Sequence, residues 1–215
     1  MSQLVSFAQL KLAAATVILS PYLPLLFMGE EYGEAAPFQY FTSHSDPELA
    51  QAVREGRRQE FAAFAWGEEV PDPQDPATFE RSKLQHALRE QPHHAALREF
   101  YQEVLRLRRT IPALATLDRE ELDVQVHEAH RSIVVRRQAG ESRVCLILCF
   151  AEQEQTVPLS LERGRWEIRL DSEAERWLGQ RSRSVERIAV HQAEYLVHLN
   201  VRPWSAVLLE FAGSA

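Results

Sequence analysis

The stretch PLLFMGEEYGEAAPFQYF, residues 24–41, decides the fold predicted for the first part of this 215-residue chain. Its apolar run ends at Gly29, three glutamates follow within five positions, and several aromatic residues come next. A continuous apolar run is typical of a strand covered on both faces, as in a parallel α/β sheet. We therefore predict a buried strand from Leu23 to Met28 with a polar, ligand-facing end.

A helix is predicted immediately before this strand. Residues 3–19 are mostly apolar, and the alanine run at 13–15 permits close packing. Pro21 ends the helix, because proline disfavours helical geometry in the residue before it. One helix followed by one buried strand is a single repeat of an α/β fold, and a single repeat cannot cover its own faces.

The size and charge of the chain limit the classes of protein to which it can belong. Its length fits one large or two small domains, and a hydrophobic content of 45% is enough for a core. The net charge of −7 argues against a phosphate-binding surface, so we predict no nucleic-acid partner. Residues 4–28 imitate a membrane span, but Lys11 and two prolines interrupt them, and we predict neither membrane insertion nor secretion.

The two cysteines, Cys145 and Cys149, lie in the run RVCLILCF. In a strand they would share a face but stand about 13 Å apart at ~3.3 Å per residue, which is too far for a disulfide. Two buried free thiols suit a reducing compartment. We therefore predict a cytoplasmic protein, and we predict no metal site because no other ligand cluster accompanies the thiols.

Three more helices are predicted before the chain changes character. Residues 46–64 open with Asp-Pro, an N-cap followed by proline at the first helical position. Pro76 leads into a short helix after a proline-rich loop. An apolar stripe at helical spacing predicts the third helix over 93–109, which Pro112 ends.

After about residue 118 the hydrophobic pattern becomes that of short strands. Seven short runs, several of them alternating, are separated by polar or glycine-containing turns: 122–128, 131–138, 143–150, 154–161, 164–171, 194–201 and 204–211. Such spacing predicts a small antiparallel β-sandwich, with 172–187 as a charge-rich surface loop. The predicted organisation is an α/β portion at 1–114 followed by an all-β domain at 115–215.

Glu30 and Glu31 are the first candidates for a functional site. Glycoside hydrolysis needs two carboxyl groups about 5 Å apart in retaining enzymes and roughly 6.5–9.5 Å apart in inverting ones. Adjacent residues at a strand end should point to opposite sides, so the two glutamates form a poor acid and nucleophile pair. Either they form a polar strand end held by hydrogen bonds, or one contacts a ligand, since ligands meet the carboxyl ends of parallel strands.

The loop aromatics Tyr32, Phe38, Tyr40 and Phe41 allow two interpretations as well. Large apolar side chains in a loop usually pack beneath it. The functional alternative is a platform for sugar rings, because a pyranose has an apolar face that stacks on an aromatic ring. Other chemistries have no support, since the sequence contains no HExxH, GxSxG, Walker-type or GxGxxG motif.

The segment LVSFAQLKLAAATVILSPYLPLLFMGEEYGE (4–34) resembles the last barrel repeat of α-amylase-type glycoside hydrolases. The segments APFQYFTSHSDPEL, REGRRQEFAAF and VPDPQDPATFERSKL extend the resemblance to the family of malto-oligosyltrehalose trehalohydrolases. The resemblance runs nearly to the end of the chain, at RPWSAVLLEF. It implies the last repeat or repeats of a (β/α)8 barrel followed by a small antiparallel β-sandwich.

The resemblance also implies an activity. Such enzymes are retaining, need no organic cofactor, and cleave the α-1,4 bond that releases trehalose from maltooligosyl trehalose. Their catalytic carboxylates lie upstream of the segment that matches this chain, and a full barrel takes ~250 residues. We therefore expect a C-terminal fragment without catalytic residues, inactive without its N-terminal barrel portion.

In that case seven residues are expected to contact the substrate: Glu30, Glu31, Tyr32, Phe38, Tyr40, Phe41 and His44. Two rival hypotheses remain open. One is a free-standing sugar-binding or interaction module, and the other is a fragment of a different α-amylase relative, such as a glycogen branching enzyme acting on another α-glucan.

Overall fold

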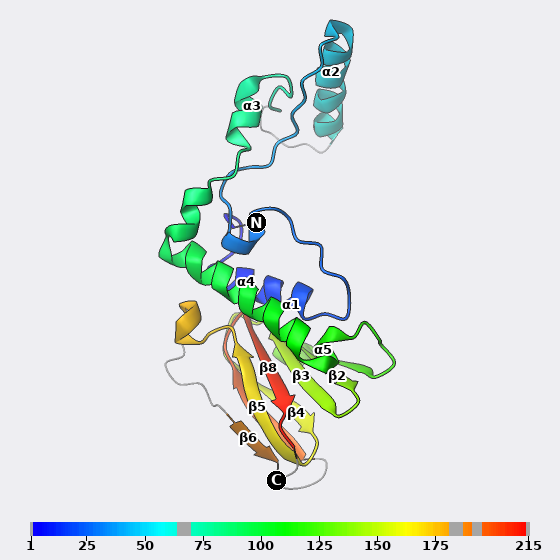
Figure 1. Ribbon diagram of the computed structural model, residues 1–215, viewed down its shortest axis with the longest axis vertical. Coiled ribbons are helices and arrows are strands. Elements are labelled where there is room, and N and C mark those ends of the chain that lie inside the picture. Colours follow the sequence, from blue (N-terminus) through cyan, green and yellow to red (C-terminus); the bar gives the residue numbers. More distant parts are fainter. Residues whose placement is uncertain (1, 64–69, 181–186, 191–194, 214–215) are drawn as a thin grey trace. The chain divides into compact units, whose positions relative to one another are not determined.

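The computed structural model describes residues 2–63, 70–180, 187–190 and 195–213 (Figure 1). The chain divides into two compact units. The larger unit combines Met1–Gly33 with Leu88–Ala215, and the smaller unit consists of Glu34–Ala87. All strands of the described residues belong to the larger unit.

Two antiparallel sheets form the centre of the larger unit. Within the described residues, one sheet has six strands in the order β1-β2-β3-β8-β5-β6, and the other pairs β4 with β7. The strands are β1 Leu122–His127, β2 Ser132–Ala139, β3 Ser142–Cys149, β4 Gln155–Leu161, β5 Gly164–Asp171, β6 Arg187–Val190, β7 Tyr195–Val201 and β8 Ser205–Phe211. Strand β8 lies inside the larger sheet, because it pairs with β3 on one side and β5 on the other.

The larger sheet has an apolar cluster on each face. Alternate residues of β3 point to opposite sides, so Cys145 and Ile147 join the cluster shared with β4 and β7, whereas Val144 and Leu146 join the cluster beneath the helices. Cys145 and Cys149 are buried and free, as the spacing predicts. Burial in this apolar cluster raises the pKa of the Cys145 thiol to about 12.

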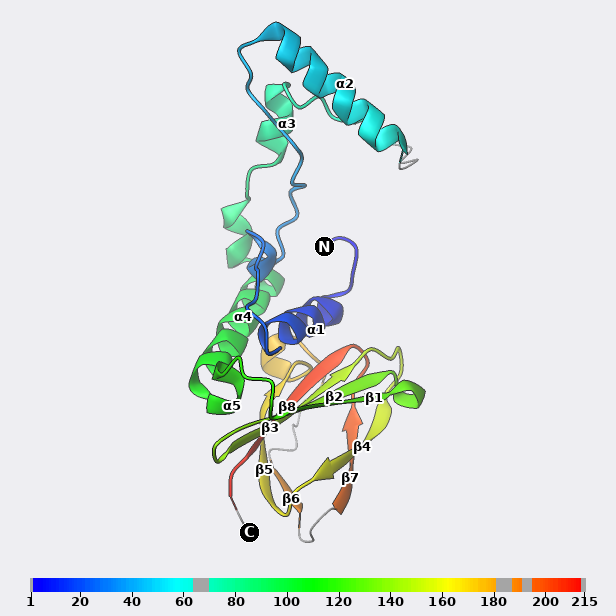
Figure 2. The same ribbon diagram turned by 90° about the vertical axis from the view of Figure 1, so that its right-hand side faces the viewer.

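Helices cover the other face of the larger sheet (Figure 2). They are α1 (Phe7–Ile18), α4 (Pro92–Thr110) and the short α5 (Pro112–Ala115). Helix α1 begins with a capping box, in which the Ser6 hydroxyl accepts from the Gln9 amide and the Gln9 side chain accepts from the Ser6 amide. Its apolar residues, Leu12 and Ile18 among them, pack in the same cluster as α4 and β8.

Lys11 of α1 is buried at the junction of helix and sheet, with 1% of its surface exposed. Its ammonium donates to the Ser172 and Trp177 carbonyls and pairs with the Glu173 carboxylate at 3.0 Å. Three acceptors thus satisfy three donors, which is the condition for burying an ammonium group. Burial lowers the pKa of Lys11, and Glu173 partly offsets that shift.

Two buried arginines hold the chain where α1 ends. Arg108 of α4 donates to the carbonyls of Ile18, Ser20 and Tyr22 over 2.5–2.7 Å. Arg137 of β2 donates to the Leu19 carbonyl at 3.2 Å and to a second carbonyl, that of Thr116, at 2.5 Å. These bonds satisfy carbonyl groups that a helix leaves without partners at its C-terminus.

The smaller unit contains α2 (Pro47–Ala63) and α3 (Pro76–Arg81). Asp46 accepts from the Glu48 amide at 2.8 Å and so caps α2. An Arg54–Asp72 pair, with Nε to carboxylate distances of 2.8 and 2.9 Å, ties α2 to the loop before α3.

Most secondary-structure predictions are confirmed. The predicted helices correspond to α1, α2, α3 and α4, and each of the seven predicted runs contains a strand. A mixed fold of helices and antiparallel sheet is therefore correct. Strand β6 was not predicted, because its four residues follow the charge-rich stretch without an alternating pattern of their own.

The buried strand predicted at 23–28 is wrong. No strand is assigned there in the described part of the chain, and Leu23 and Leu25 are 81% and 92% exposed. The physical reason is pairing, since an apolar run becomes a buried strand only where neighbouring strands complete its hydrogen bonds. The segment 21–28, named here the apolar segment, thus exposes side chains that the sequence pattern places in a core.

The surface loop predicted at 172–187 is also wrong in part. Ser172 and Glu173 are buried beside Lys11, and a 3-10 turn at Glu175–Trp177 packs Trp177 against Phe100. The buried lysine explains the difference, because its acceptors must come with it into the interior. The part of this prediction at 181–186 lies outside the described residues.

None of the helices in the described residues combines the length and the apolar character that a bilayer crossing requires.

Candidate functional site

Residues 29–34, GEEYGE, form a short turn between two glycines. Gly29 has φ 86° and Gly33 has φ 71°, values that favour glycine, and Glu30–Tyr32 make one 3-10 turn between them. The prediction that Glu30 and Glu31 end a strand is therefore wrong. They occupy successive positions of a helical turn instead.

Helix α4 holds this turn. Nδ1 of His94 lies 2.6 Å from the Tyr32 carbonyl oxygen, and the Arg89 guanidinium lies 4.9 Å from the centre of the Tyr32 ring. Tyr101 of α4 lies near the Glu30 and Glu31 carboxylates, whose charges act on its hydroxyl. The tyrosine of the motif is thus held by His94 at the start of α4 and by Arg89 in the 3-10 turn just before that helix.

Electrostatics favour a protonated phenol beside the glutamates. Tyr101 is 7% exposed, and its burial, together with the Glu30 and Glu31 carboxylates, raises the pKa of its hydroxyl above the ordinary value. The hydroxyl therefore stays protonated beside the two carboxylates. Glu30 and Glu31 are half-buried, whereas Tyr32 is fully buried.

Gly33 has little room for a side chain. A Cβ at this position would lie 3.3 Å from Leu97 and 3.8 Å from Nδ1 of His94. The turn therefore lies close against α4, and the left-handed backbone adds a second reason for glycine.

The aromatic candidates of the smaller unit form an exposed cluster. Phe38 is 57% exposed, Tyr40 49% and Phe41 37%. Phe41 makes edge-to-face contacts with Phe38 and Phe79, with ring centres 6.2 and 5.1 Å apart. These residues, together with Phe79, are named here the aromatic cluster, and it presents apolar ring surface to solvent.

A guanidinium and the backbone fix this region of the smaller unit. The Arg57 guanidinium lies 4.8 Å from the Tyr40 ring centre. The amide of His44 donates to the Gln74 side-chain oxygen at 3.3 Å, and the imidazole of His44 is exposed. Glu34 accepts from the Gln85 amide at 2.7 Å. An extended chain is thus held with its aromatic side chains outward.

The predicted site residues fall in both units. Glu30, Glu31 and Tyr32 belong to the larger unit, and Phe38, Tyr40, Phe41 and His44 belong to the smaller one. Sequence reasoning missed His94 and Tyr101 of α4. The signal for them was their spacing, because both lie on the same helical stripe as Leu97.

The turn offers hydrogen-bond acceptors. The part of the chain that the structure describes contains no group of three acidic, histidine or cysteine residues placed to hold a metal ion. Carboxylates accept hydrogen bonds from hydroxyl groups, and exposed rings pack on apolar ligand faces. The turn of the larger unit thus offers acceptors for a hydroxyl-rich ligand, and the aromatic cluster of the smaller unit separately offers apolar surface.

Known structures first define the class of protein that the chain resembles. A crystal structure from Salmonella typhimurium, provisionally described as an alpha amylase, matches with a TM-score of 0.73 and 31% identity. The match covers 97% of this chain and 31% of that protein. No protein-family model matches the sequence.

Curated relatives define the resemblance further. The malto-oligosyltrehalose trehalohydrolase of Rhizobium sp. (strain M-11) is 42% identical over 164 residues, 76% of this chain and 26% of that protein. The enzyme of the same name from Brevibacterium helvolum is 50% identical over 118 residues, 54% of this chain and 20% of that protein. The predicted resemblance to malto-oligosyltrehalose trehalohydrolases is confirmed. The chain spans about a quarter of the Rhizobium relative.

Proposed function

We propose that this chain is the C-terminal part of a retaining α-glucan hydrolase that releases trehalose from maltooligosyl trehalose. The observation that carries the proposal is the 42% identity over 164 residues to a malto-oligosyltrehalose trehalohydrolase. Residues 1–114 would belong to the catalytic barrel, and 115–215 would form its β-sandwich domain. The two free buried thiols favour a reducing compartment, so the proposed location is the cytoplasm.

The exposed apolar segment supports the part of the proposal that concerns a partner. Six of its large apolar side chains, Tyr22, Leu23, Leu25, Leu26, Phe27 and Met28, are between 36% and 92% exposed. A contiguous exposed apolar run marks a surface that another structure covers. In this proposal the N-terminal barrel portion covers it and supplies the catalytic carboxylates, so the chain alone is inactive.

The turn at 29–34, named here the glutamate turn, and the aromatic cluster have separate roles in this proposal. Glu30 and Glu31 accept hydrogen bonds from sugar hydroxyls, with the buried phenol of Tyr101 near them. Phe38, Tyr40 and Phe41 pack on sugar faces, with His44 beside them, and Tyr32 anchors its turn by filling the interior.

The first experiment tests inactivity. The isolated chain is incubated with maltooligosyl trehalose and free trehalose is measured. We expect no release above background, whereas a chimera that joins the preceding part of the Rhizobium relative to this chain releases trehalose. Release by the isolated chain would show that catalytic groups lie within these 215 residues.

The second experiment tests the substrate contacts in that chimera. Glu30→Gln keeps the size of the side chain but removes its charge, and we expect trehalose release to fall about tenfold, as for a lost charged hydrogen bond. Glu152→Gln changes an exposed glutamate of the β domain and serves as the matched control. Equal activity of the two variants would contradict the role of Glu30.

A free-standing sugar-binding module is the second candidate, favoured by the exposure of the aromatic cluster. In this alternative the isolated chain binds maltodextrin saturably. Neither the chain nor the chimera hydrolyses the sugar. Activity of the chimera would exclude this alternative.

A further inference from the structure

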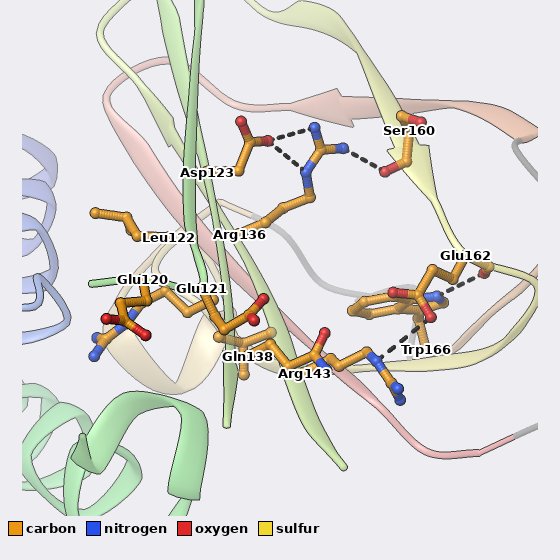
Figure 3. Close-up of a pocket in the computed structure, with 12 residues that line it drawn as sticks. Glu120, Glu121, Leu122, Asp123, Arg136, Gln138, Arg143, Ser160, Glu162 and Trp166 are labelled. Atoms are coloured by element: carbon orange, nitrogen blue, oxygen red, sulfur yellow. Dashed lines mark hydrogen bonds and ion pairs between the residues drawn. The ribbon is translucent and has the colours of Figure 1, made fainter. Parts of the chain in front are cut away.

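A cavity of about 290 Å³ lies in the β domain, and none of the residues that line it belongs to the glutamate turn or the aromatic cluster (Figure 3). The ends of β1, β2 and β3 form one wall, and the end of β4 and the start of β5 form the other. Its volume is at the lower end of the range of about 300–1,000 Å³ typical of small-molecule sites.

The strand register explains why this cavity is polar. On β2 the face toward β4 and β7 carries Val134 in the core, then Arg136 and Gln138 at the strand end. On β3 the paired positions run from Cys145, opposite Arg136, to Arg143, opposite Gln138. This face of the larger sheet therefore changes from apolar to polar at the edge where β2 ends and β3 begins.

The cations of the cavity are neutralised by fixed partners. The Arg136 guanidinium lies 2.6 and 3.0 Å from one oxygen of Asp123 and donates to the Ser160 carbonyl at 2.5 Å. Arg143 Nε lies 3.4 Å from the Glu162 carboxylate. Arg137, the third guanidinium of the cavity, donates to the Leu19 and Thr116 carbonyls, so each of the three has a polar partner, which argues against a phosphate ligand.

The remaining surface offers acceptors and an apolar floor. Within the described residues, the Glu120 and Glu121 carboxylates form no side-chain hydrogen bond or ion pair, and Glu121 projects toward Gln138 in Figure 3. Trp166 forms the floor, 3% exposed, with its indole N–H donating to the Glu162 carbonyl at 3.1 Å. Figure 3 shows Glu162 and Trp166 together at one end of the cavity.

We propose that this cavity binds one neutral saccharide ring. Four carboxylates and three guanidiniums line it, so its charges nearly cancel while hydrogen-bonding groups remain at several positions of the lining. A neutral, hydroxyl-rich ring exploits such positions without requiring a net charge, and the small volume limits the site to about one ring. That the ring belongs to an α-glucan rests on the proposed function, whereas the neutral saccharide class rests on the cavity itself.

The NMR resonance of the Trp166 indole N–H is expected to shift when a ligand occupies the cavity, so it can be used to test for saccharide binding. The chain, labelled with ¹⁵N, is titrated with maltotriose while its indole resonances are followed, and Trp166→Phe assigns the relevant peak. We expect a saturable shift with a dissociation constant in the millimolar range. Xylotriose in a parallel titration distinguishes a glucan from another neutral saccharide, and inorganic phosphate tests for an anion.

The matched variants separate this site from the aromatic cluster. Glu121→Ala with Gln138→Ala removes exposed or half-buried groups of the cavity, and we expect binding at the Trp166 reporter to weaken about tenfold. Phe38→Ala with Phe41→Ala should leave that affinity unchanged. No saturable shift with either sugar, an equal shift with phosphate, or full affinity in the cavity variant would overturn the proposal.

Measuring trehalose release by the chimera separates the test of the cavity from the test of the proposed function. Trehalose release together with absence of binding at Trp166 would refute the cavity proposal alone. Binding at Trp166 together with an inactive chimera would refute the proposed hydrolase alone.

Discussion

Strand β8 and the apolar segment 21–28 have similar composition but opposite environments. In β8, Ala206, Val207, Leu208 and Leu209 are at most 1% exposed, because β3 and β5 pair with the strand on its two sides and apolar clusters cover its two faces. In the apolar segment, Leu25 is 92% exposed and no strand is assigned in the described residues. Hydrophobicity alone thus does not determine burial, and the presence of pairing partners does.

The largest expected difference concerns thiol reactivity. Leu25→Cys places a thiol in the apolar segment, whereas Cys145 pairs with Leu209 of β8 in the sheet. Cys145 reacts only when the sheet opens, and an open fraction of about 10⁻³ or less slows its labelling at least about a thousandfold. Its pKa of about 12 further reduces the thiolate at pH 8.

Labelling with a thiol-specific reagent, followed by peptide mass analysis, measures both rates in one molecule. Urea supplies the control, because unfolding exposes every thiol and should bring the rates together. Equal rates in the native chain would mean that the sheet around β8 is open.

The next largest effect is a difference in the free energy of unfolding between a leucine-to-alanine change in β8 and the same change in the apolar segment. Leu208→Ala removes a fully buried side chain and should lower the free energy of unfolding by about 2–5 kcal/mol. Leu25→Ala should change it by less than about 0.5 kcal/mol, since the side chain is already in solvent. Urea unfolding followed by tryptophan fluorescence measures both. A large effect at Leu25 would show that the apolar segment is covered in solution.

The two lysines of the chain, Lys11 and Lys83, extend the contrast to charge. Lys11→Met leaves the buried Glu173 carboxylate without its cation and should cost about 3 kcal/mol of unfolding free energy. Lys83 pairs with Glu80 at the surface, so Lys83→Met should cost less than about 1 kcal/mol. Similar losses in the two variants, measured by urea unfolding, would contradict the burial of Lys11.

The smallest effect is a pH dependence in the smaller unit. A hydrogen bond from the Gln74 amide, helped by Arg54, holds the pKa of Asp72 below its usual value. The carboxylate therefore adds stability above its ordinary pKa, and this contribution is lost as pH falls through the lowered one. Asp72→Asn should remove the pH dependence at a cost below about 1 kcal/mol, because the pair is exposed.

Amide hydrogen exchange of α2 and α3 at several pH values measures this effect. Glu48→Gln on α2 is the control and should keep the dependence. An unchanged pH profile in Asp72→Asn would assign it to another group.

The sequence predicts elements well where a local pattern decides the structure. Alternation located the seven strand runs of the β domain, and the cap at Asp46 located α2. The elements that failed depend on distant partners. The apolar segment lacks a neighbouring strand in the described residues. Residues 172, 173 and 177 are buried because Lys11, more than 160 positions away, needs their acceptors.

The candidate site was predictable in part for the same reason. The motif GEEYGE and the following aromatics identify themselves by composition, so Glu30 and Phe38 could be named from the sequence. The placement of Tyr101 near Glu30 could not be predicted, because it depends on how α4 packs against the turn. The polar cavity beside Trp166 was equally hidden, since it arises from register between strands.

The two guanidiniums at the end of α1 have a consequence for assembly. Arg108 and Arg137 retain their protons at any physiological pH, so the carbonyls of residues 18–22 remain tethered under all such conditions. Residues 23–28 lie between these bonds and the turn at 29–33, which packs against α4. A partner that covers this short segment therefore restricts few residues, at a conformational entropy cost of about 1–2 kcal/mol for each residue that it fixes. A segment anchored at both ends loses less conformational entropy on binding than a free chain terminus does.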